Sequence, residues 1–152
     1  MSIPMGNLSF TLQSFALILV LLVLGGRGGT VAVAVYLILG MVGLPVFSGF
    51  RGGIGILLEA TGGYLLGFLL CPLAYGLATA RSNRASARLS GCLLGLLACY
   101  AFGTLWYLLL YGGGATGLLP VLSACVLPFL LPDLIKLGLA FLLHRRLNRY
   151  LK

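Results

Sequence analysis

Few residues in this chain have side chains that could do chemistry, and two of them are spaced as a pair. Asp133 and Lys136, in the segment PDLIK, lie three residues apart, so they share one face of a helix. The pair can satisfy itself as an ion pair that anchors the end of that helix. It can also form a polar patch in a ligand cavity, where it offers one hydrogen-bond acceptor and one cation. The sequence leaves both interpretations open.

The remaining polar residues do not assemble an enzyme site. Glu59 is the only other acidic residue, and His144 is the only histidine. A Ser–His–Asp set is excluded, because His144 is expected at the opposite end of its helix from Asp133. The segment 49–55, GFRGGIG, lacks the GK[ST] of a phosphate-binding loop. We therefore expect no enzyme activity, no bound metal and no cofactor.

The four cysteines are expected to be small, buried packing residues. They lie in apolar runs, without a CxxC motif or a nearby histidine that would indicate a metal site. They are Cys71, Cys92, Cys99 and Cys125.

The composition indicates an integral membrane protein. Of the 152 residues, 61% are hydrophobic and 8% are charged, whereas a soluble domain carries about 25% charged residues. The net charge of +8 does not indicate nucleic acid, because seven of the ten basic residues lie in 81–88 and 144–152. Both clusters flank apolar runs, which is the distribution of the positive-inside rule.

Five apolar runs are expected to cross the bilayer as helices, since each is close to the length of about 20 residues that a span needs. Because Pro128 and Pro132 disfavour a continuous helix, we expect the last helix to begin at Leu131, with Pro132 in its first turn. The segment 118–127 then forms a short interfacial or re-entrant helix. The alternative is one long, kinked helix from residue 118. The five runs are 10–24, 30–44, 61–80, 89–111 and 131–147, and the glycine-rich segment GGRGG at 25–29 is expected to connect the first two.

Charge also predicts the orientation. The RSNRASAR segment at 81–88 and the C-terminal tail belong on the inner side, and two spans between them agree with this. Counting back along the chain places 49–60 and Met1 outside. Five spans with an external N-terminus suggest that a first helix is absent from this chain.

A glycine-rich segment, GFRGGIGILLEATGGY at 49–64, interrupts the apolar sequence on the predicted outer side. Glycine permits unusual backbone angles and close approach, so this segment can fold back over a cavity. Irregular backbone at membrane depth is tolerated where protein or a water-filled cavity satisfies it. The simpler interpretation is a flexible connector in which Arg51 and Glu59 are ordinary solvated charges.

Small and aromatic residues indicate how the helices pack. GYLLG at 63–67 and GCLLG at 91–95 have the GxxxG spacing that permits close helix contacts. Trp106, Tyr107 and Tyr111 lie at the predicted outer end of their helix. They form an aromatic belt at the membrane interface or, alternatively, a stacking wall for a flat ligand.

Three long segments carry a family resemblance: 2–13 (SIPMGNLSFTLQ), 36–68, which contains LPVFSGFRGG and TGGYLLGF, and 126–147 (VLPFLLPDLIKLGLAFLLHRRL). The chain resembles the BioY family of bacterial biotin transporters, the substrate-binding (S) components of energy-coupling factor (ECF) transporters. The resemblance implies one all-α domain, residues 1–152, with the fold of a six-helix transmembrane bundle. Ile3 and Pro4, which follow the first helix in the family, stand almost at the start here, so most of that helix is missing.

The resemblance also implies a function. An S component in the bacterial plasma membrane captures biotin near the outer surface, and a partner membrane subunit with two ATPase subunits drives its release inward. The implied biotin-binding residues are Phe47, Arg51, Gly52, Gly53, Thr61, Gly62, Gly63, Tyr64, Asp133 and Lys136.

One local feature departs from the family pattern. The family commonly has proline before TGGY, whereas this chain has Ala60 preceded by Glu59, an acid of unknown role.

Two alternatives to a biotin-binding subunit stay open. One is a structural or assembly membrane protein that binds no small molecule, and the other is a solitary facilitator that needs no ATPase.

Overall fold

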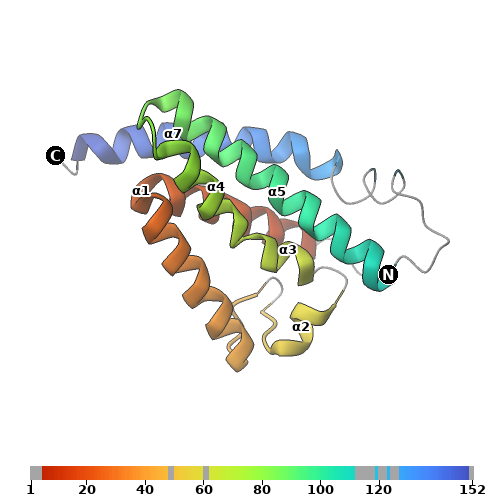
Figure 1. Ribbon diagram of the computed structural model, residues 1–152. Helices are drawn as coiled ribbons and strands as arrows, with labels where there is room; N and C mark the ends of the chain where they lie inside the picture. Colours follow the sequence, from red (N-terminus) through yellow and green to blue (C-terminus); the bar gives the residue numbers. More distant parts are fainter. Residues whose placement is uncertain are drawn as a thin grey trace.

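The computed structural model describes residues 5–47, 50–59, 62–111, 119, 123 and 127–150, and helices are the regular elements in this part of the chain (Figure 1). One isolated antiparallel bridge joins Phe47 to Arg51. The helices are α1 (Met5–Val42), α2 (Ile54–Leu58), α3 (Gly62–Gly67), α4 (Leu70–Thr79), α5 (Ala85–Tyr111) and α7 (Leu127–Tyr150).

Helix α1 contains the first two predicted spans and is kinked between them. Gly25 has φ 74° and ψ −176°, far from helical values, and a left-handed φ of this kind favours glycine. The kink falls at the start of the predicted connector 25–29, so the chain turns within one residue. Figure 1 shows the two limbs of α1, red and orange, diverging from this point.

The structure confirms an apolar, membrane-spanning architecture. Among the described residues, three helical stretches are long and apolar enough to cross a bilayer: Leu12–Val42, Gly62–Thr79 and Ala85–Leu110. The first of these is folded at Gly25. The second is nearly continuous, because only Phe68 and Leu69 separate α3 from α4.

The last helix begins earlier than the sequence predicted. Helix α7 starts at Leu127, and Pro132 lies inside it, so the predicted start at Leu131 was wrong. Pro132 is the sixth residue of α7, and its missing N–H removes a single hydrogen bond to the carbonyl of residue 128 in the first turn. The helix therefore continues through the proline. Most of the predicted short helix 118–127 lies outside the described residues.

Helices α3 and α4 pack closely on α5 through glycines. A Cβ atom added at Gly95 would lie 2.8 Å from the Cα atom of Cys71, and one added at Gly63 would lie 2.3 Å from the Cβ atom of Trp106. These contacts confirm the interpretation of the GxxxG segments as close helix contacts.

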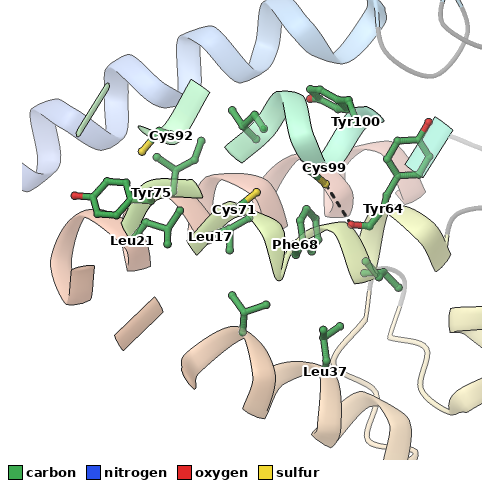
Figure 2. Close-up of a cluster of buried hydrophobic side chains, with 14 of the residues drawn as sticks. Leu17, Leu21, Leu37, Tyr64, Phe68, Cys71, Tyr75, Cys92, Cys99 and Tyr100 are labelled. Carbon is green, nitrogen blue, oxygen red and sulfur yellow. Dashed lines mark hydrogen bonds between the residues drawn. The ribbon is translucent and has the colours of Figure 1, made fainter. Parts of the chain in front are cut away.

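Three of the four cysteines are buried and free in this interface, as the sequence predicted. Cys71 Sγ contacts the carbonyl oxygen of Gly95 at 3.2 Å, and Cys99 Sγ contacts that of Tyr64 at 3.3 Å (Figure 2). Cys92 is the third. Cys125 lies outside the described residues.

The two basic clusters lie at the same end of the molecule. Arg88, which ends the 81–88 segment, places Nη1 3.0 Å from Nε2 of His144 on α7. The α1 kink lies at this end as well, because Gly26 packs against Gly76 near the end of α4. The structure therefore agrees with the prediction that both clusters face the same side of the membrane.

Candidate functional site

A cavity of about 490 Å³ lies between the two limbs of α1, a volume within the range of small-molecule sites. Residues 43–47 and 50–53, called the covering segment below, close one side of it. The α1 residues that line the cavity are Leu12, Gln13, Ala16, Leu17, Val20, Ala32, Val33 and Tyr36. The other lining residues are Pro45, Val46, Phe47, Phe50 and Phe68.

The covering segment is tied to α1 by its backbone and by two aromatic rings. The hydroxyl of Tyr36 donates to the carbonyl of Val46 at 3.1 Å, and the Phe47 ring meets the Tyr36 ring edge-on, with centroids 5.6 Å apart. The N–H of Gly53 donates to the carbonyl of Gly40 at 2.7 Å. This part of the chain therefore folds back over the cavity, as the glycine content suggested.

Two glycines make this fold possible. Gly53 has φ 108°, a left-handed value that L side chains rarely adopt. At Gly52 an added Cβ atom would lie 2.3 Å from the carbonyl oxygen of Leu44. The first position needs the conformational freedom of glycine, and the second needs its small size.

Arg51 and Glu59 form an ion pair at the rim of the covering segment. Arg51 Nη2 lies 2.5 Å from Glu59 Oε1, and Nη1 donates to Oε2 at 3.1 Å. The side chains are 56% and 43% exposed. The carbonyl of Glu59 accepts a hydrogen bond from Trp106 Nε1 at 3.3 Å. The two charges are therefore exposed but paired.

Asp133 and Lys136 lie in a second polar region, called the polar cluster below, together with Ser14 and Tyr100. Lys136 Nζ is 2.5 Å from Asp133 Oδ1 and donates to Ser14 Oγ at 2.9 Å. Ser14 Oγ donates to Asp133 Oδ1 at 3.2 Å, and the hydroxyl of Tyr100 donates to Asp133 Oδ2. The side chains of Asp133 and Lys136 are buried.

The polar cluster has the ion pair that the i,i+3 spacing predicts. The sequence did not identify Ser14 and Tyr100, because they come from α1 and α5 and reach Asp133 through tertiary packing. Their residue types gave no signal, since single serines and tyrosines in apolar runs are common. Sequence reasoning also missed Gln13 and Tyr36, whose side chains line the cavity.

The predicted site residues divide into three groups. Phe47 lines the cavity, and Arg51, Gly52 and Gly53 belong to the covering segment. Asp133 and Lys136 lie in the polar cluster and do not line the cavity. Gln13 of α1 lines the cavity, while the next residue, Ser14, contacts the cluster.

The third group packs between helices. Gly62, Gly63 and Tyr64 are buried at the start of α3, and the Tyr64 hydroxyl lies 3.4 Å from Thr104 Oγ1 of α5. None of these three lines the cavity. Thr61 lies outside the described residues. Within the described part of the chain, no group of three or more histidine, cysteine or acidic residues could hold a metal ion.

Comparison with known proteins decides the family. A family model described as the BioY family matches residues 1–152. The chain belongs to the BioY family. It is 40% identical to a biotin transporter BioY of Thermotoga maritima, over 97% of this chain and 85% of the relative. It is 37% identical to a probable biotin transporter BioY of Pyrococcus horikoshii, over 97% and 85%.

The fold also agrees with a solved structure. The crystal structure of the S component for biotin from an ECF-type ABC transporter matches with a TM-score of 0.76 at 29% identity. The match covers 90% of this BioY-family chain and 74% of that one. The likeness confirms the predicted all-α fold. The relatives are named as transporters rather than as enzymes, in agreement with the expectation from the residues.

Proposed function

We propose that this chain binds biotin within the membrane and serves as the S component of an ECF-type transporter. Membership of the BioY family and the likeness to a biotin S component support the proposal. The structural observation that carries it is the cavity of about 490 Å³ beneath the covering segment. This is the part of the chain in which the resemblance expected the ligand.

The cavity wall suits the apolar portion of biotin. Apart from Gln13 and Tyr36, the described side chains that line it are apolar. Aromatic rings from Phe47, Phe50 and Phe68 supply flat surfaces, and small-molecule sites commonly combine such walls with a few polar groups. Biotin, with its fused rings and valerate chain, has the corresponding apolar surface.

The polar cluster supplies a further set of candidate contacts. We propose that Asp133 accepts hydrogen bonds from the ureido N–H groups of biotin and that Lys136 donates to its ureido carbonyl. In the structure the two residues pair with one another and contact Ser14 and Tyr100. Binding by this route exchanges some of these contacts for contacts with biotin. Gly62, Gly63 and Tyr64 are proposed to support the site from the start of α3, and Thr61, which precedes them in the sequence, is proposed to take part as well.

Titration of the purified, detergent-solubilised chain with biotin tests the function. The proposal expects saturable binding with one biotin per chain. Biocytin, in which lysine is attached to the biotin carboxylate, is a useful second ligand because it retains the ring system. Absence of saturable biotin binding by a folded, monodisperse sample would favour the structural or assembly alternative.

Coupling to ATP hydrolysis is a separate proposal. We propose that the chain, in the bacterial plasma membrane, associates with a membrane-embedded coupling subunit and two ATPase subunits, because the solved structure that it resembles is the S component of an ECF-type ABC transporter and its own sequence has no GK[ST] motif. Reconstitution in liposomes separates this from the facilitator alternative. Biotin accumulation should require the coupling subunit, the ATPases and ATP. Flux through the chain alone at the same rate would indicate a facilitator.

A further inference from the structure

The Arg51–Glu59 ion pair begins at the residue that follows Phe50, a residue of the cavity wall. Arg51 is the only basic residue of the covering segment. Phe50, its neighbour in the chain, and Phe47 both line the cavity. The N–H of Phe47 also donates to the carbonyl of Arg51 at 3.0 Å, which fixes the Arg51 backbone beside the cavity wall. Arg51 is therefore held next to the part of the cavity wall that Phe47 and Phe50 form.

The cavity itself cannot hold an acid group well. Its described polar side chains are Gln13 and Tyr36, and neither carries a positive charge. Burial of an ionised carboxylate without a cation is strongly unfavourable. A ligand with an apolar body and a terminal carboxylate therefore gains most when the carboxylate stays at the rim. There it meets the planar guanidinium fork that binds carboxylates with two parallel hydrogen bonds.

Lys136 is less available than Arg51 to pair with the carboxylate of a ligand. It is buried, it forms an ion pair with Asp133 at 2.5 Å, and it donates to Ser14 at 2.9 Å. Pairing Lys136 with a ligand carboxylate would bring a second anion beside Asp133. Arg51, by contrast, is 56% exposed and is paired with a residue that is itself 43% exposed.

Glu59 already occupies the guanidinium fork in the way that a ligand carboxylate would. Its two oxygens lie 2.5 and 3.1 Å from Nη2 and Nη1 of Arg51. We infer that Glu59 is a built-in competitor, which holds Arg51 in the empty protein and is displaced by the carboxylate of the ligand. The inference rests on the proposed biotin function. The exchange keeps one ion pair at Arg51 and releases the Glu59 side chain to solvent.

Two ligands and one substitution test the competition. Biotin carries the carboxylate, whereas biotinamide carries a neutral carboxamide on the same rings and chain. Because an exposed ion pair is weak, Glu59→Gln should tighten biotin binding by about 2- to 5-fold. Binding of biotinamide should not change. Weaker binding of both compounds would overturn the inference, since Glu59 would then stabilise the covering segment in its position over the ligand.

An Arg51→Gln background distinguishes competition from simple charge repulsion. Loss of the negative charge at Glu59 could favour any anionic ligand through space, with or without Arg51. Competition for the guanidinium requires Arg51, so Glu59→Gln should have no effect on biotin affinity once Arg51 is replaced. A gain of the same size in both backgrounds would overturn the inference.

The same titrations separate the inference from the function on which it rests. If the unaltered chain binds both compounds but Glu59→Gln leaves biotin affinity unchanged, the competitor role is wrong and the biotin function stands. If the unaltered chain binds neither compound, the proposed function is wrong and the inference falls with it.

Discussion

Asp133 and Lys136 form the ion pair that one of the two interpretations of the sequence predicted, and their role in a ligand site stays a prediction. They form a buried ion pair, and the pair also meets Ser14 and Tyr100, so three donors already serve the Asp133 carboxylate. Removing one member of a buried pair leaves an uncompensated charge, which is costly. The ion pair therefore contributes to folding whether or not it also contacts biotin.

Substitution of the two residues separates these roles. Hydrogen bonds to charged groups contribute about 1.5–3 kcal/mol, so Asp133→Asn and Lys136→Met should each weaken biotin binding roughly 10- to 200-fold. Both variants should still insert into the membrane. Titrations of the two single variants and the double variant, with melting curves, provide the measurement.

The double variant distinguishes a role in biotin binding from a role only in the stability of the protein. If the pair acts only within the protein, the single variants melt at lower temperature, the double variant recovers stability, and biotin affinity is the same in all of them. Unchanged affinity in both single variants would remove Asp133 and Lys136 from the binding site.

The covering segment depends on glycine for the close contact between its two parts, 43–47 and 50–53. A Cβ atom at Gly52 would overlap the carbonyl oxygen of Leu44, so the segment has to move to accept a larger residue. Overpacking of this kind costs about 1–3 kcal/mol. Gly52→Ala should therefore weaken biotin binding by roughly 5- to 100-fold, and Gly53→Val should weaken it because of the left-handed φ at that position.

Gly55→Ala is the matched control for these variants. Gly55 lies in α2, and nothing lies within 4 Å of a Cβ atom added there. Alanine also favours helix more than glycine does, so binding should stay at the level of the unaltered chain. Titration of the three variants with biotin shows whether the covering segment takes part in binding. If Gly52→Ala and Gly53→Val bind as Gly55→Ala does, the covering segment is a connector without a role in binding.

The elements also show what the sequence could and could not predict. The glycine run at 25–29 predicted a break between two spans, and Gly25 makes it, because composition and local backbone freedom decide such a break. Pro132 misled the prediction for α7, since a proline near the start of a helix removes only one hydrogen bond. The spacing of Asp133 and Lys136 predicted their contact, because that contact is local to one helix.

The long-range contacts followed from no sequence pattern. Ser14 reaches Asp133 across 119 residues of chain, and Tyr100 reaches it across 33. Tyr36 and Gln13 meet because α1 turns sharply enough at Gly25 and the limbs then enclose a cavity. Such contacts depend on how helices pack, and a single sequence does not specify the packing. The resemblance to the BioY family supplied the function, and the residues alone indicated a small membrane protein.

The distribution of charge orients the protein at the scale of the whole molecule. Arg88 and His144 meet at the end where α4 leads into α5, and α2, which follows the covering segment in the chain, lies away from that end (Figure 1). From the positive-inside rule we expect the basic end to lie in the cytoplasm. Biotin would then enter from the outer side, beneath the covering segment.

Cysteine labelling in intact cells checks the orientation. In a version without the native cysteines, Ile54→Cys should react with a membrane-impermeant maleimide added outside, because 49–60 is predicted to be external. Ser86→Cys, in the 81–88 segment, should react only after the membrane is permeabilised. The opposite pattern would invert the topology and place the cavity on the cytoplasmic side.

Protection of the cavity wall by biotin tests whether biotin binds between the two limbs of α1. Ala16 lines the cavity and is exposed, and Ala101 on α5 is also exposed but does not line it. Ala16→Cys and Ala101→Cys, each in the cysteine-free chain, are labelled in detergent with and without saturating biotin. Biotin is expected to slow labelling at residue 16 and to leave labelling at residue 101 unchanged. Equal labelling of Ala16→Cys with and without biotin, in a sample that binds biotin, would contradict this expectation.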